Sequence, residues 1–178
     1  MSASTQTRYS KVAISLHWLI ALMIIGLLIV GFVMGEIDKA DPLKYKLYQL
    51  HKSFGITVLA LSLLRLVWRL THPAPPLPPD SKRWEKAVAH LTHFGFYALM
   101  IGLPLVGWLG VSTSPLKIPT MIFWLFQLPH LPFFQDTPGA SHQLFELHET
   151  LAYILIGLLA LHAGAALKHH FLLKNDVV

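Results

Sequence analysis

Four histidines that lie within apolar stretches carry most of the chemistry suggested by this sequence: His17, His51, His148 and His162. His148 and His162 are fourteen residues apart in one stretch, which is about 21 Å along a helix at ~1.5 Å per residue. At ~100° per residue, the second imidazole returns to within about 40° of the first. One helix therefore presents two imidazoles to the same interior, one near each side of a membrane.

His51 and His17 lie in two other apolar stretches, at depths that match those of His148 and His162. If successive stretches alternate in direction, His51 and His148 form an outer pair, and His17 and His162 form an inner pair. Neutral imidazole is a good axial ligand for haem iron. This layout predicts two stacked haems, each held by a histidine from either side, and hence electron transfer across a membrane.

Three alternatives to this interpretation stay open. A single membrane histidine commonly makes a hydrogen bond to a neighbouring helix. Zinc or copper is the competing metal, but it favours three or four ligands at one depth, with Glu149 as the nearest carboxylate candidate. His90 and His93 lie at nearly the same depth as His17, so either of them is a possible inner ligand in place of His162.

Two cations and three glycines lie near the predicted haem positions. Arg65 follows His51 by fourteen residues, so it is expected on the same face at the inner depth, where it binds a haem propionate or extends to the inner interface. Lys52 is expected to bind an outer propionate or to face water. Gly55, Gly157 and Gly164 would let a macrocycle approach the backbone, or they serve as ordinary helix contacts.

The elements that must position these residues are membrane helices. The chain has 178 residues, of which 54% are hydrophobic and 13% charged, a balance far from that of a soluble domain. Four segments are long enough to span a bilayer: 11–35, 47–70, 84–112 and 144–170. The predicted fold is therefore an all-α integral membrane protein, a four-helix transmembrane bundle forming one domain over 1–178.

The distribution of lysine and arginine predicts the orientation of the chain. With four spans, nine of these residues fall on the side of the termini and five on the other side, which predicts that both termini lie on the cytoplasmic side of the membrane. The net charge of +5 is thus a topology signal and no argument for nucleic acid.

The sequence has no cysteine, which excludes disulfides, thiolate metal sites and iron–sulfur clusters.

The connections between the spans differ in character. Five prolines between residues 73 and 79 predict a stiff extended linker before the third span, and Asp80 or Ser81 is expected to cap the helix that follows. Pro104 is expected to bend that helix. The long outer connection over 113–143 contains an apolar run at 121–126, too short to span a membrane, for which we expect an interfacial helix or a lid over the outer cofactor.

With these residues in view, the chain resembles the bacterial cytochrome b561 family over nearly its whole length. The resemblance rests on the segments YSKVAISLHWL at 9–19, LHKSFG at 50–55, RLVWR at 65–69, AHLTH at 89–93, LHETLA at 147–152 and LHA at 161–163. It implies a dihaem four-helix protein with two haem b groups, whose axial ligands are His17, His51, His148 and His162. It also implies electron transfer between a small outer donor, for which superoxide has been proposed, and membrane ubiquinone.

For the quinone, the candidate hydrogen-bond donors at the inner face are His90, Lys168 and His169. Outer lysines would attract a small anion, although contact with lipid headgroups is the plainer explanation of these lysines. Two rival functions are a haem-bearing anchor subunit that relays electrons for a hydrogenase or dehydrogenase, and a histidine-lined metal or proton transporter.

Overall fold

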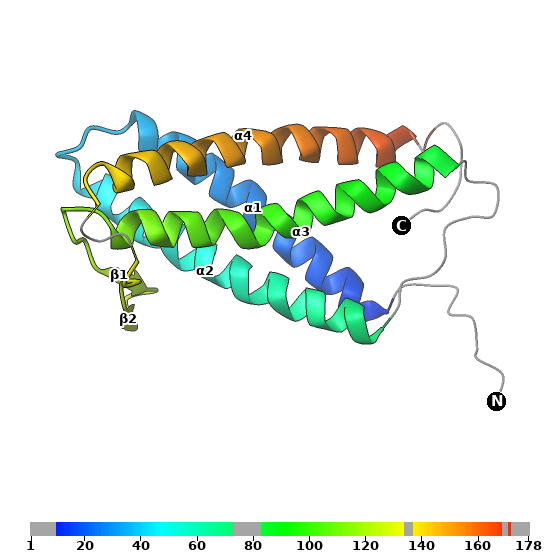
Figure 1. Ribbon diagram of the computed structural model, residues 1–178, viewed down its shortest axis with the longest axis horizontal. Helices are drawn as coiled ribbons and strands as arrows, with labels where there is room; N and C mark the ends of the chain where they lie inside the picture. The colour runs from blue at the N-terminus through cyan, green and yellow to red at the C-terminus, as the bar shows by residue number, and fades with distance from the viewer. Residues whose placement is uncertain (1–9, 73–82, 134–136, 169–170, 172–178) are drawn as a thin grey trace.

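Four long helices form the protein, and a short hairpin lies beside one end of them (Figure 1). The computed structural model describes residues 10–72, 83–133, 137–168 and 171. The helices are α1 (Lys11–Glu36), α2 (Pro42–Thr71), α3 (Arg83–Ser112) and α4 (Ala140–Leu167), and strands β1 (Thr120–Ile122) and β2 (Phe126–Leu128) follow α3. All four helices are long and apolar enough to cross a membrane, which confirms the expected all-α membrane architecture. The proline-rich linker and its proposed capping residues lie outside the described residues.

Local signals explain where the helices begin. Ser10 caps α1 by accepting a hydrogen bond from the backbone N–H of Ala13 at 3.2 Å. Asp41 caps α2 in the same way and Pro42 occupies its first turn, so this helix begins five residues before the expected span at 47. Gly139 precedes α4 with φ of 76°, a conformation that favours glycine. Pro104 lies inside α3 without ending it.

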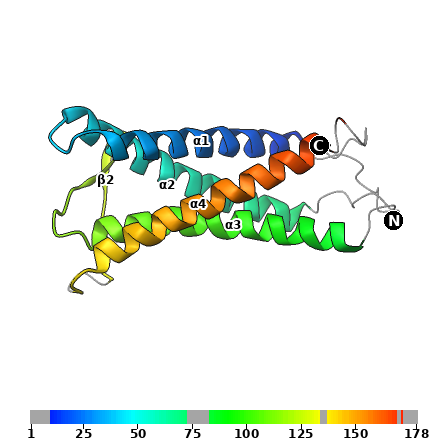
Figure 2. The same cartoon turned by 90° about the horizontal axis from the view of Figure 1, so that it is seen from above.

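The helices pack in the pairs α1 with α2, α2 with α3, and α3 with α4. Figure 2 shows α4 running obliquely in the view between α1 and α3. The buried core joins all four helices, with Ile20 and Ile24 of α1, Val58 of α2, Leu99 of α3 and Leu155 of α4 among its members. Large apolar side chains remain exposed along every helix, which is the surface expected of a protein whose solvent is lipid.

The outer connection differs from the expected interfacial helix over 121–126. Thr120 pairs with Leu128 and Ile122 with Phe126 in an antiparallel hairpin. Phe123 and Trp124 form its turn with φ of 48° and 58°, the signature of a tight hairpin turn.

Contacts with α2 explain why a hairpin forms here. The fully buried side chain of Gln49 donates to the Pro119 carbonyl at 3.0 Å and accepts from the Met121 N–H at 3.1 Å. Ser53 donates to the Met121 carbonyl and accepts from the Phe123 N–H. Of the two alternatives expected for this run, the interfacial helix is therefore wrong, because α2 satisfies the hydrogen bonds of this backbone in an extended conformation. The lid over an outer cofactor stays a prediction.

Candidate functional site

The structure brings the four histidines together as two pairs. The rings of His51 on α2 and His148 on α4 have centroids 6.1 Å apart and planes at 68°. The rings of His17 on α1 and His162 on α4 have centroids 6.2 Å apart and planes at 71°. The first pair lies toward the hairpin end of the bundle, and the second toward the opposite end.

The spacing within each pair suits one metal ion held between two imidazoles. Metal–imidazole bonds of about 2 Å on either side bring the two ring centroids to about 6 Å from one another. Across the described part of the chain, no three His, Cys, Asp or Glu side chains gather as a metal site. Two imidazoles at this spacing are compatible with ligation of one haem iron by each pair.

His148 is oriented by the backbone of α3. Its Nδ1 lies 3.0 Å from the carbonyl oxygen of Leu103, so a proton on Nδ1 makes a hydrogen bond and leaves the lone pair of Nε2 available to a metal ion. Gly107 allows this approach: a Cβ added there would lie 3.1 Å from two atoms of the imidazole. An oriented ring with a defined tautomer is the usual arrangement of a metal-ligating histidine.

His51 is placed in a related way against α1. Its ring interacts with the Leu27 carbonyl, although its buried Nδ1 completes no hydrogen bond among the described residues. A Cβ added at Gly31 would lie 3.5 Å from the ring. On both sides of the outer pair, a leucine carbonyl and the glycine four residues later back the imidazole. We call each such combination a backbone seat.

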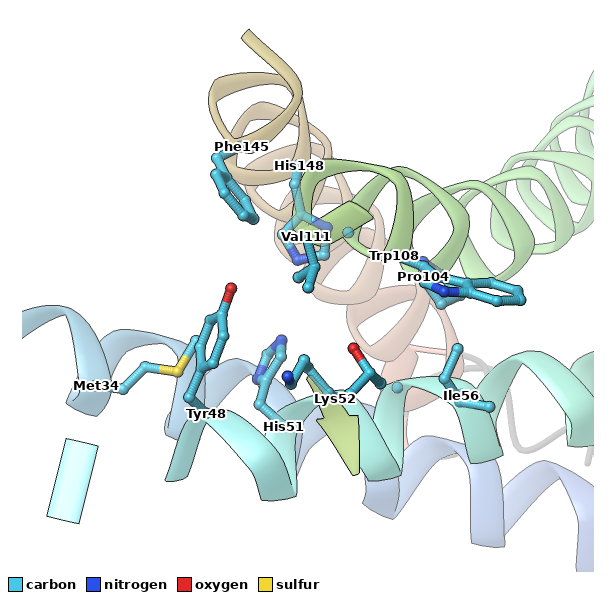
Figure 3. Close-up of a pocket in the computed structure, with 13 residues that line it drawn as sticks. Met34, Tyr48, His51, Lys52, Ile56, Pro104, Trp108, Val111, Phe145 and His148 are labelled. Carbon is cyan, nitrogen blue, oxygen red and sulfur yellow. The ribbon is translucent and has the colours of Figure 1, made fainter. Parts of the chain in front are cut away.

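Two cavities adjoin the outer pair, and both are lined by His51, Gly55, Pro104 and His148. The larger one, of about 420 Å³, extends toward the middle of the bundle between apolar side chains of all four helices, and its volume lies in the range of cofactor sites. The smaller one, of about 110 Å³, lies toward the hairpin. Figure 3 shows the rings of His51 and His148 facing one another across it.

The inner pair has different neighbours. The Phe96 ring contacts His162 edge-on with centroids 5.2 Å apart, and Arg65 and His93 interact electrostatically with His162. Arg65 donates to the Tyr97 hydroxyl at 3.4 Å and to the Ala13 carbonyl at 3.5 Å. Both hydrogen bonds are long, and no acidic partner of Arg65 occurs among the residues described.

The remaining predicted residues lie as follows. Lys52 is half-buried and donates to the Pro119 carbonyl of the outer connection at 2.7 Å. His90 and Lys168 are exposed at the inner end of the bundle, and His169 lies outside the described residues. Gly55 lines both cavities, as noted above. A Cβ added at Gly157 or Gly164 would meet nothing within 4 Å, so these two glycines accommodate no close neighbour in this structure.

Sequence reasoning missed the glycines that contact the histidine rings, Gly31 and Gly107. The signal available was a leucine followed four residues later by glycine on each helix that precedes a histidine-bearing helix. Such a pattern is common in membrane helices, so it does not identify a cofactor site by itself.

Comparison with known proteins identifies the family of this chain. Residues 8–178 match the family model described as prokaryotic cytochrome b561. Cytochrome b561 homolog 2 of Escherichia coli K12 is 30% identical over 175 residues, covering 98% of this chain and 91% of the relative. The probable superoxide oxidase CybB of Yersinia pestis is 30% identical over 177 residues, covering 96% and 93%. Cytochrome b561 homolog 1 of Escherichia coli K12 is 29% identical over 171 residues, covering 96% and 94%.

Proposed function

The chain belongs to the prokaryotic cytochrome b561 family, and from this premise we propose that it carries electrons between a donor at the outer face and ubiquinone through two haem b groups. Membership of the family makes it a multi-pass bacterial membrane protein with b-type haem and a role in electron transfer. The proposal adds the number of haems, their ligands, the two redox partners and the treatment of 1–178 as one domain.

The observation that carries the proposal is the presence of two histidine pairs with nearly equal ring separations at two depths. His51 and His148 would hold an outer haem, and His17 and His162 an inner one. When bound, the two haems supply one-electron redox centres that lie near opposite sides of the membrane. With two imidazoles available to hold each haem, the chemistry that the protein would support is electron transfer.

The rest of the site controls these centres. The apolar walls of the larger cavity exclude water, which affects the reduction potential of a buried haem. At the inner pair, Arg65 has a guanidinium without an acidic partner among the described residues, and we assign it to an inner haem propionate.

The assignment of the redox partners is supported by the name of one relative and by the positive charges at the hairpin end of the bundle. One relative is named a probable superoxide oxidase, which supports superoxide as the outer donor. Lys39, Lys44 and Lys46 lie at the hairpin end and would attract a small anion. His90 and Lys168 are exposed at the opposite end, where their N–H groups are available to a quinone carbonyl. The termini would lie on this cytoplasmic side, following the distribution of lysine and arginine.

The first experiment is a haem count on the detergent-purified full chain, by pyridine haemochrome, together with a reduced-minus-oxidised spectrum. We expect two haem b groups per chain with low-spin, six-coordinate spectra. Addition of superoxide should then reduce them, and a soluble ubiquinone analogue should reoxidise them. One haem per chain, or a colourless protein, would contradict the dihaem assignment. Two haems that respond to neither reagent would instead favour an anchor subunit that needs a catalytic partner.

A further inference from the structure

The smaller cavity contains two polar groups that are not fully satisfied by the protein. It has a volume of about 110 Å³ and lies on the hairpin side of the outer pair, with Tyr48, Lys52 and Thr120 in its lining. Thr120 is 2% exposed, and its Oγ1 has no hydrogen-bond partner within the described part of the chain. A buried hydroxyl without a partner costs free energy of about 1–3 kcal/mol, so its presence beside a cavity indicates a ligand.

The position of Thr120 is imposed by α2. Its neighbour Pro119 accepts hydrogen bonds from Gln49 and Lys52, and its other neighbour Met121 bonds to Gln49 and Ser53. The backbone on both sides of Thr120 is therefore held, and rotation of the strand cannot bring its hydroxyl to another partner. The hairpin thus serves to place one polar side chain at the cavity.

Lys52 supplies a positive charge at the same place. Its Nζ donates to the Pro119 carbonyl and lies 5.0 Å from the centroid of the Tyr48 ring. An ammonium has three N–H donors, so one neutral acceptor and one ring leave donor capacity. Of the described residues that line this cavity, none is Asp or Glu. Figure 3 shows Tyr48, His51 and Lys52 projecting from α2 on the same side.

We propose that Lys52 and Thr120 form a binding site for one carboxylate-sized anion beside the outer histidine pair. The occupant we assign is a propionate of the haem held by His51 and His148, so the inference rests on the proposed function. A carboxylate can accept hydrogen bonds from the Lys52 ammonium and the Thr120 hydroxyl, and it neutralises the half-buried charge. The other source of this chemistry is a small free anion from the aqueous phase.

The test compares two variants at the site with two matched controls. Lys52→Met keeps the aliphatic stem and removes the charge, and Thr120→Val keeps the shape and removes the hydroxyl. Lys117→Met removes an exposed charge from the outer connection. Ser62→Ala removes another buried hydroxyl that has no hydrogen-bond partner among the described residues, one that lines neither cavity. Haem content is measured first, and then each haem is titrated spectroelectrochemically in the purified holoprotein.

We expect the midpoint potential of the outer haem to fall in Lys52→Met and to fall less in Thr120→Val. Loss of positive charge near a haem favours its oxidised form, which carries the greater positive charge. The potential of the inner haem and both potentials in the two controls should stay at their wild-type values. Unchanged outer potentials in both site variants, with two haems bound, would overturn the anion site and leave the proposed function standing.

Two further measurements identify the source of the anion. With haem labelled by ¹³C at its propionates, a labelled carboxylate band in the redox infrared difference spectrum should shift in Lys52→Met. A band that does not shift, together with an outer potential that depends on formate concentration only when Lys52 is present, would assign the site to a free anion. A colourless protein that formate stabilises against heat only through Lys52 would retain the anion site and refute the proposed function. No formate effect on a colourless protein would refute both.

Discussion

The two histidine pairs have nearly equal ring separations but are held by different parts of the protein. At the outer pair, each imidazole rests against the backbone of a neighbouring helix, at Leu103 and Gly107 for His148 and at Leu27 and Gly31 for His51. Main-chain atoms of a long helix have little freedom to move. The outer pair is therefore positioned by rigid elements, and the hairpin lies beside it, across the smaller cavity.

Side chains surround the inner pair instead. Phe96 contacts His162, Trp18 contacts His17, and Arg65 lies close enough to interact with both rings. Of the described glycines, none would bring a Cβ within 4 Å of the His17 or His162 ring. Side chains can change rotamer, so this site adapts more easily to substitution. We therefore expect steric changes at the glycines beside the imidazoles to affect only the outer haem, and loss of the Arg65 charge to affect only the inner haem.

Removal of one ligand from each pair should have the largest effect and test whether the pairs are independent. His148→Ala should lose the outer haem and retain the inner one, and His162→Ala should do the reverse. Each substitution removes one of the two histidines from one pair and leaves the other pair intact. Haem content per chain and the number of redox transitions measure this. Loss of both haems in both variants would show that the pairs do not bind separately.

Gly107→Ala should have the next largest effect, restricted to the outer haem. The new methyl group would lie 3.1 Å from the His148 ring. The Leu103 carbonyl contacts one side of this ring, and a bound haem would restrain the other side. Overpacking of this kind costs about 1–3 kcal/mol. We expect a changed g-value for the outer haem in electron paramagnetic resonance, with reduced occupancy of that haem.

Gly102→Ala is the matched control for this variant, because it lies on the same helix and a Cβ there meets nothing within 4 Å. It should leave both g-values unchanged. If the two alanine variants behave alike, the backbone seat on α3 does not position His148. The outer pair would then not differ from the inner pair in being held by backbone contacts.

Arg65→Met should lower the midpoint potential of the inner haem, since it removes a positive charge that interacts with His17 and His162. A shift on the order of 60 mV, which corresponds to a tenfold change in a one-electron equilibrium, is expected. Arg83→Met, an exposed charge on α3, serves as the control. A shift confined to the outer haem would reverse the proposed placement of the two haems.

Gly31→Ala should have the smallest effect. Its Cβ would lie 3.5 Å from the His51 ring, which is ordinary van der Waals contact. Replacement of a helical glycine by alanine stabilises a helix by about 0.5–1 kcal/mol, so thermal stability should be unchanged or slightly higher, with an unchanged outer haem spectrum. An effect as large as that of Gly107→Ala would mean that the distance from the added Cβ to the imidazole does not determine whether alanine is tolerated at Gly31 and Gly107.

Much of the architecture followed from local sequence signals. The four spans were predicted from apolar length, and Asp41 followed by Pro42 accounts for the earlier start of α2. The grouping of His51 with His148 followed from helix periodicity and antiparallel topology. For His17, depth alone left His162, His90 and His93 as possible partners, and the structure places the His162 ring against it.

The outer connection could not be predicted because its conformation depends on distant residues. An apolar run between two prolines is compatible with a short helix or a hairpin, and the choice is made by Gln49 and Ser53, which lie about seventy positions earlier and bond to its backbone. The position of the Thr120 hydroxyl depends on this hairpin, so its place beside the cavity could not be predicted from the sequence either.

The membrane helices, the relative depth of each histidine and the family could be predicted from the sequence, because apolar length, a period of 3.6 residues and local motifs need no tertiary information. The backbone atoms that contact each imidazole and the residues that surround each pair could be identified only in the folded structure. Those features are distances between atoms of different helices, and rotations of the packed helices that leave the sequence pattern intact would change them.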